Sequence, residues 1–376
     1  MAFEYVEVNG RSIRVRPLAI EKEIDEYGNF HRQPNRFTTG FGPGENPVEA
    51  DRYILFWAKG CNWSNRAAIV RELLGIDAIK VEIVGQDPTH GKGEKKEEAP
   101  AAPPQGAACC ILPRTGKKEQ EAEPRPLGWE FVNSPDHINP ETGAMFLSEL
   151  YYNADPDYAG RTTVPALVDY TTGKVVNNDY HRLTNYFEVD FKPFQKKDAP
   201  DLYPEELREE IDALNAWLFD NVNNAVYRAQ FAQSLQAFAD GYETFFAGLD
   251  QMDKRLSDRR FLFGDYVTDS DVRLFTTLAR LDVSYSRNIA PCKHRLVDYE
   301  NLWPYARDLY QIPAFRHNTY LKDIISRTPA KPGSGRKGFD ATFYDLVLPN
   351  MDLDAIWMTD TGRERLSRDP GHKFRK

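Results

Sequence analysis

The chain has 376 residues, which is more than one hydrophobic core usually needs, so we expect two packed units. Hydrophobic residues make up 41% and charged residues 28%, the balance of a soluble globular protein. The 48 Lys and Arg against 57 Asp and Glu give a net charge of −9, which argues against a nucleic-acid or anionic-membrane partner. No stretch approaches the roughly 20 apolar residues that span a bilayer.

The N-terminus lacks the basic and apolar regions of a secretory signal, and four cysteines are too few for a disulfide scaffold. We therefore expect a cytoplasmic protein whose cysteines are judged by their reactivity. The seven histidines are scattered without ligand spacing, and no CxxC or HExxH occurs, so we expect no metal site.

Residues 1–50 carry little periodic apolar pattern and form an N-terminal extension. Strands are predicted at 53–57 and 79–83, separated by a helix that starts near Cys61 and ends at Gly75. Residues 86–125 contain no aromatic residue and are rich in Lys, Glu, Pro, Ala and Gly, which is typical of a flexible insertion.

A strand at 164–168, a hairpin partner at 174–176 and a helix around 183–187 follow the insertion. The order of elements over 51–190 predicts a thioredoxin-like α/β sandwich.

Helical patterns dominate from residue 200 to 328 and predict an all-α bundle. We expect one helix that opens at Pro204, a longer one that carries the apolar residues from Phe231 to Leu249, and another that begins at a Thr268–Asp271 capping box. Residues 329–376 form a C-terminal tail. The fold class is thus α/β followed by all-α.

Cys61 is the strongest candidate for chemistry. It lies between a strand and the first turn of a helix, where unpaired amides and the helix dipole favour the thiolate over the thiol. Ser64 replaces the second cysteine of a redox pair, so a reaction cycle would pass through a mixed disulfide with an external thiol. The alternative is a buried structural cysteine. Cys109 and Cys110 are expected to be inert exposed thiols, and Cys292 structural.

Two further positions carry weaker signals. A proline that opens a strand opposite such a thiol is often cis, so Val164-Pro165 is a candidate peptide-binding element, or an ordinary strand start. Asp179-Tyr180 precede a helix, where a ligand carboxylate can bind. Asp179 is equally well explained as a helix cap.

The sequence resembles the xi-class glutathione transferases, the glutathionyl-hydroquinone reductases, over residues 15 to 325. The segments that carry the resemblance are RYILFWAKGCNWSNRAAIVRELLG (52–75), LGWEF (127–131), YNADP (152–156), GRTTVP (160–165), WLFDNVNNAVY (217–227), FLFGD (261–265), DVRLFTTL (271–278) and YENLW (299–303).

The resemblance implies a glutathione transferase fold and a homodimer. It also implies that the Cys61 thiolate attacks the sulfur of a glutathionyl-hydroquinone, and that a second glutathione resolves the mixed disulfide. Trp129, Val164 and Pro165 would hold the tripeptide, and the Asp179-Tyr180 pair would take its γ-glutamyl end. Tyr227 matches the quinol-binding tyrosine, a position that periodicity alone assigns to helix packing.

Some positions depart from the family pattern. Its Cys-Pro is Cys61-Asn62 here, its Glu-Ser clamp is Asp179-Tyr180, and its C-terminal motif has no counterpart. Because this clamp recognises glutathione in the family and differs here, another low-molecular-weight thiol is an alternative co-substrate. Two other functions stay open: an omega-like thiol transferase that reduces disulfides, and a transferase-like binding module without catalysis.

Overall fold

The computed structural model describes residues 4–8, 10–15, 23–86, 128–325 and 347–375 of the chain. The predicted insertion at 86–125, with Cys109 and Cys110, lies outside the described residues except for Gln86. So do residues 329–346 of the predicted tail.

A four-stranded mixed sheet with the order β4-β3-β5-β6 organises the N-terminal half. Strand β3 (Tyr53–Trp57) pairs in parallel with β4 (Ile79–Ile83) and antiparallel with β5 (Ala166–Asp169). Strand β6 (Lys174–Asn177) forms a hairpin with β5. All four predicted strands are present.

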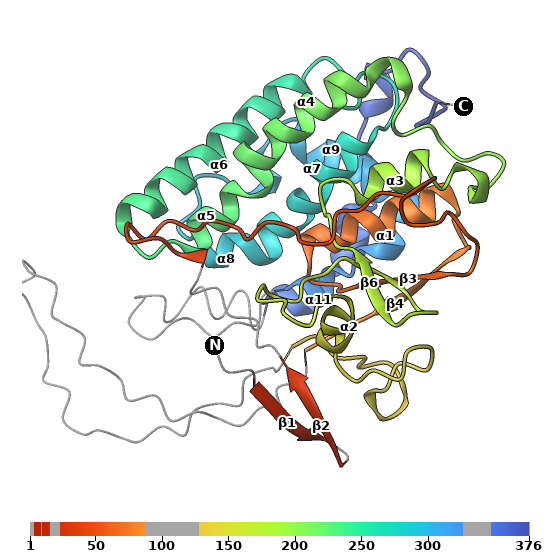
Figure 1. The fold of residues 1–376 in the computed structure, drawn as a ribbon. Helices are drawn as coiled ribbons and strands as arrows, with labels where there is room; N and C mark the ends of the chain where they lie inside the picture. Colours follow the sequence, from red (N-terminus) through yellow and green to blue (C-terminus); the bar gives the residue numbers. More distant parts are fainter. Residues whose placement is uncertain (1–3, 9, 16–22, 87–127, 326–346, 376) are drawn as a thin grey trace, which may run out of the picture.

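The alternation of side chains along β3 assigns a different set of helices to each face of the sheet. Tyr53 and Leu55 belong to the hydrophobic cluster that contains residues of α1 and α3, whereas Ile54 and Phe56 belong to the cluster of α2. Figure 1 shows α1 and α3 on the side of the sheet that faces the C-terminal helices. These sheet-covering helices are α1 (Asn62–Leu74), α2 (Leu147–Ala154) and α3 (Leu183–Val189).

The C-terminal half is helical. One cluster of buried side chains extends from β3 and α1 into α6, α7 and α9, so both halves share one core. Its helices are α4 (Arg208–Leu218), α5 (Ala225–Phe231), α6 (Leu235–Arg255), α7 (Asp269–Arg280), α8 (Ser286–Asn288), α9 (Leu302–Tyr310), α10 (Pro313–Asn318), α11 (Leu321–Ile324) and α13 (Leu353–Trp357).

The predicted fold class is confirmed: a thioredoxin-like sheet with helices on both faces precedes a helical bundle. None of the helices in the described part of the chain is long and apolar enough to cross a membrane.

One predicted helix is wrong. The pattern from Phe231 to Leu249 suggested a single helix, but α5 ends at Phe231 and α6 begins at Leu235. Ser234 is the reason, because its hydroxyl accepts a hydrogen bond from the Ala237 amide and so caps α6. The helix expected to open at Pro204 starts with a 3-10 turn over Glu205–Leu207.

Among the elements that were not predicted, two pack against each other. A two-stranded hairpin, β1 (Glu4–Val8) and β2 (Arg11–Val15), lies within the segment read as an unpatterned extension. It buries Ile13 and Val15 against Met145 and Phe146 at the start of α2, which the sequence pattern also missed. The hairpin and α2 are short. Their apolar residues are buried because the two elements pack against each other, so neither gives a clear pattern alone.

Candidate active site

Cys61 ends the bend after β3 and is the N-cap residue of α1, with extended backbone angles (φ −80°, ψ 117°). Its side chain is half-buried, and Sγ lies 3.4 Å from the carbonyl oxygen of Val164. The Val164–Pro165 peptide bond is cis, as the sequence favoured. The amides of the first turn of α1, which have no partner within the helix, point toward this cap position.

The bend that presents Cys61 is held from two sides. Ser64 donates its hydroxyl hydrogen bond to the carbonyl oxygen of Ala58 (3.2 Å) and accepts one from the Ala58 amide (3.1 Å). From α7, the buried Arg280 guanidinium donates to the carbonyl oxygens of Gly60 and Lys59, both at 3.1 Å. Ser64, at the position of the second cysteine in a redox pair, thus stabilises the bend.

Asn62, where the family pattern has proline, ties the start of α1 to the helical half. Its amide Nδ2 is fully buried and donates to Thr277 Oγ1 at 2.9 Å, and Asn223 Nδ2 donates to the same oxygen at 2.7 Å. Three residues from α1, α7 and the turn before α5 therefore meet directly behind the cysteine.

Tyr227 on α5 faces the same region. Its hydroxyl lies 2.9 Å from that of Tyr285, and its ring packs 5.8 Å from that of Trp63. Burial raises the pKa of Tyr227, negative charge on Cys61 raises the pKa further, and the cation of Arg32 opposes both. The phenol therefore keeps its proton near neutral pH and can act as a hydrogen-bond donor.

A π-helical turn at Phe219–Asn223 precedes α5, which carries Tyr227, and Tyr285 is the last residue of a second π-helical turn, Leu281–Tyr285, after α7. Such turns widen a helix locally and often occur at functional sites. Sequence periodicity gave no sign of either turn, and it did not single out Tyr285.

The side chains of Asp179 and Tyr180 lie in different environments. Asp179 Oδ1 accepts hydrogen bonds from Asn35 Nδ2 (2.9 Å) and from the His181 amide (3.0 Å), and its backbone oxygen accepts from the Leu183 amide at the start of α3. Tyr180 packs its ring 4.8 Å from Trp63. Burial raises the pKa of Tyr180 and lowers the pKa of His181 to about 4.

Trp63 links these groups. The guanidinium carbons of Arg32 and Arg66 each lie 4.6 Å from the centre of its ring. Arg66 is 2% exposed, its burial lowers its pKa to about 9, and within the described residues its Nε and Nη2 have no hydrogen-bond partner.

An N-terminal strap, residues 28–37, joins the two halves in front of this region (Figure 1). On the helical side Gly28 accepts from the Gln233 amide, and Arg32 Nε donates to Asn224 Oδ1 at 2.9 Å. On the other side Asn35 reaches Asp179, and the Phe37 amide donates to Asn178 Oδ1 at 3.0 Å. The strap lies in the N-terminal extension, whose sequence shows no periodic pattern that would single out these residues.

Comparison with known proteins identifies the family. The model "Glutathione S-transferase, C-terminal domain" matches residues 235–308. The glutathionyl-hydroquinone reductase YqjG of Escherichia coli is 33% identical over 309 residues, 79% of this chain and 83% of the relative. The chain belongs to the xi class of glutathione transferases.

Solved xi-class structures agree with this assignment. The xi glutathione S-transferase of Phanerochaete chrysosporium superposes with a TM-score of 0.66 at 30% identity, covering 80% of this chain and 88% of that one. The glutathione-bound structure of YqjG superposes with a TM-score of 0.62 at 31% identity, covering 77% and 86%.

In this xi-class transferase the predicted site residues fall into two neighbouring groups. Cys61, Val164 and the half-buried Trp129 belong to one hydrophobic cluster. Tyr180 and Tyr227 both contact Trp63, which lies two residues after Cys61. No group of three His, Cys, Asp or Glu side chains able to hold a metal occurs within the described ranges.

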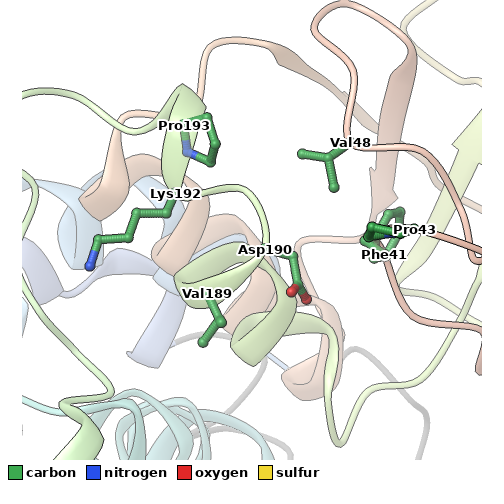
Figure 2. Close-up of a pocket in the computed structure, with 8 residues that line it drawn as sticks. Phe41, Pro43, Val48, Val189, Asp190, Lys192 and Pro193 are labelled. Atoms are coloured by element: carbon green, nitrogen blue, oxygen red, sulfur yellow. The ribbon is translucent and has the colours of Figure 1, made fainter.

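A separate surface hollow of about 610 Å³ lies between the loop after the strap and the end of α3. Figure 2 shows Pro43 and Val48 on one side of it and Val189, Asp190 and Lys192 on the other. No residue of the cysteine site lines this hollow, so we assign it no part in the chemistry.

Proposed function

We propose that this transferase is a glutathione-dependent thiol oxidoreductase that removes the glutathionyl group from glutathionyl-hydroquinones through a mixed disulfide at Cys61. The observation that carries the proposal is the position of the Cys61 sulfur at the N-terminus of α1, 3.4 Å from the Val164 carbonyl oxygen. Relatives that bear the name glutathionyl-hydroquinone reductase support the reaction type.

The proposed first step exchanges one bond for another. The Cys61 thiolate attacks the sulfur of the aromatic thioether, a sulfur–sulfur bond forms, and the bond between that sulfur and the ring carbon breaks. The electron pair goes to the ring carbon, which takes up a proton to give the hydroquinone. The half-buried Tyr227 phenol, whose pKa is raised, is the donor that supports this leaving group.

In the second step a glutathione thiolate attacks the mixed disulfide, releases the Cys61 thiolate and leaves as glutathione disulfide. The ring is reduced, and two glutathione thiols are oxidised, one of them supplied by the substrate. No second cysteine is required, which agrees with the hydrogen bonds that commit Ser64 to Ala58.

We assign glutathione binding to Trp129, Val164, Pro165 and the Asp179-Tyr180 pair. Asp179 uses Oδ1 for Asn35 and His181, whereas Oδ2 makes no hydrogen bond to any described residue and can receive the γ-glutamyl ammonium group. The Tyr180 ring packs against Trp63 at the position where the family pattern has a small hydroxyl.

The test compares two cysteine variants. Cys61→Ser should lower the rate of hydroquinone release from a glutathionyl-hydroquinone by at least about a thousandfold. Cys292→Ser, which removes the other described cysteine, should leave the rate unchanged. Full activity of Cys61→Ser would refute the proposal.

A second candidate function is omega-like reduction of small mixed disulfides, which the absence of a resolving cysteine at position 64 also favours. Rates with a glutathionyl-hydroquinone and with a small glutathionyl disulfide, measured on the same preparation, distinguish the two. We also infer a cytoplasmic homodimer, the assembly and location expected from the family and the composition, which sedimentation and cell fractionation test.

A further inference from the structure

Arg32 occupies an aromatic enclosure at the side of the site. Its guanidinium carbon lies 4.6 Å from the ring centre of Trp63, 4.7 Å from Tyr227, 5.4 Å from Phe30 and 6.0 Å from Tyr180. The strap brings it there from outside both halves of the protein. Rings on several sides hold the planar guanidinium in one orientation through cation–π contact.

The guanidinium has more hydrogen-bonding capacity than its surroundings use. An arginine carries five N–H donors, and among the described residues Arg32 uses only Nε, toward Asn224 Oδ1. Nη2 is buried without a partner, and no carboxylate in the described part of the chain forms an ion pair with Arg32. A partly buried cation without a counter-ion favours an anionic ligand, because desolvation weakens its contact with water.

The position of Arg32 points to the aromatic end of the substrate. It lies closer to the Tyr227 ring than to the Tyr180 ring, and the strap's contact with Asp179, at the γ-glutamyl end, is made by Asn35 instead. A planar guanidinium forms two parallel hydrogen bonds to a carboxylate, and it also stacks on an aromatic face.

We propose that Arg32 is a specificity-determining residue that binds an acidic substituent of the aromatic substrate, so that the enzyme prefers aromatic rings carrying a carboxylate. The proposal rests on the proposed function for the identity of the aromatic site. Its test uses binding alone and needs no turnover, so that a failure of the chemistry at Cys61 would not affect it.

The probes are hydroquinone and 2,5-dihydroxybenzoate, which differ by one carboxylate. Isothermal titration of the wild-type chain should show at least about tenfold tighter binding of the dihydroxybenzoate. Arg32→Gln should remove this preference by weakening the dihydroxybenzoate about tenfold, with hydroquinone affinity changed by less than about twofold.

Arg36 provides the matched control. It lies on the same strap, its side chain is 66% exposed, and it pairs with Asp155 at 3.1 Å. Arg36→Gln makes the same change in net charge and should preserve the preference. Because Arg32 also joins the strap to Asn224, Arg32→Lys is the second variant. It keeps the positive charge but loses the two parallel N–H donors of the guanidinium. It should lower the affinity for dihydroxybenzoate by about threefold and leave the hydroquinone affinity unchanged.

Three results would overturn the proposal. One is a wild-type chain that does not bind the dihydroxybenzoate more tightly than hydroquinone. Another is the same loss in Arg36→Gln as in Arg32→Gln, which would indicate a general effect of charge. The third is an Arg32 variant that loses glutathione binding while the dihydroxybenzoate affinity stays the same, which would assign Arg32 to the thiol end of the site.

Discussion

The hydroxyl oxygens of Tyr227 and Tyr285 lie 2.9 Å apart, one on α5 and the other at the end of the π-helical turn that follows α7. Burial raises the pKa of both phenols, so the pair holds two protons and one hydrogen bond near neutral pH. Only one phenol can donate to the other, and the remaining hydroxyl hydrogen is available for the site.

Tyr227→Phe removes this donor without emptying the space that the ring fills. We expect kcat for hydroquinone release to fall by about a hundredfold while KM stays nearly unchanged, because the hydroxyl acts on the leaving group rather than on binding. Steady-state kinetics measures both. Tyr242→Phe, whose hydroxyl donates to the Pro291 carbonyl oxygen outside the site, is the control. A tenfold or larger rise in KM at unchanged kcat would show that Tyr227 serves binding instead.

His181 gives the region a pH-dependent stability. Burial lowers its pKa to about 4 from the ordinary value of 6.5, so between these values the unfolded chain binds more protons than the folded chain. The free energy of unfolding therefore falls as the pH drops through this window.

Denaturant unfolding at pH 7 and pH 4 measures this effect. Wild type should lose up to about 3 kcal/mol more than His181→Gln does between the two pH values. His317→Gln is the control, since the His317 side chain is 64% exposed. If wild type and His181→Gln lose stability in parallel, His181 is not buried in the way described.

Asp271 holds the start of α7, the helix that supplies Thr277 and Arg280 to the site. Its buried carboxylate accepts hydrogen bonds from the amides of Leu262 and Thr268, and from the hydroxyl of Tyr305. Asp271→Ala leaves these buried donors unpaired and should lower the free energy of unfolding by about 3 kcal/mol.

The control for Asp271→Ala is Asp258→Ala, at a carboxylate that is 70% exposed, and its expected effect is below about 0.5 kcal/mol. Thermal or urea unfolding checks both variants. A loss below 1 kcal/mol for Asp271→Ala would mean that α7 does not depend on its capping box.

The parts of the fold that local pattern encodes were predictable. The run Tyr53–Trp57 followed by a bend, Cys61 and an apolar periodicity reads as strand, turn and helix without tertiary information, and that reading placed the cysteine at the start of α1. The capping box of α7 was predictable for the same reason, since Thr268 and Asp271 are three residues apart.

What the sequence could not reveal are contacts between residues distant in the chain. Arg32 meets Asn224 across 192 positions and Asn35 meets Asp179 across 144, and neither residue belongs to a periodic pattern. From the sequence, Asn62 was notable only because it replaces the proline of the family pattern. In the structure its side-chain amide donates a hydrogen bond to Thr277. Trp63 and Arg66 are neighbours on one helix, but the burial of Arg66 without an ion-pair partner among the described residues arises only when the two halves pack together.

The most direct test of the mixed-disulfide mechanism is the mass of the intact protein after a single turnover. Reduced, glutathione-free protein is mixed with a stoichiometric amount of a glutathionyl-hydroquinone and quenched with acid. We predict one equivalent of free hydroquinone and one glutathionyl adduct, located at Cys61 by peptide mapping and removed by added glutathione. Hydroquinone release without an adduct at Cys61, or an adduct of equal yield in Cys61→Ser, would contradict the mechanism.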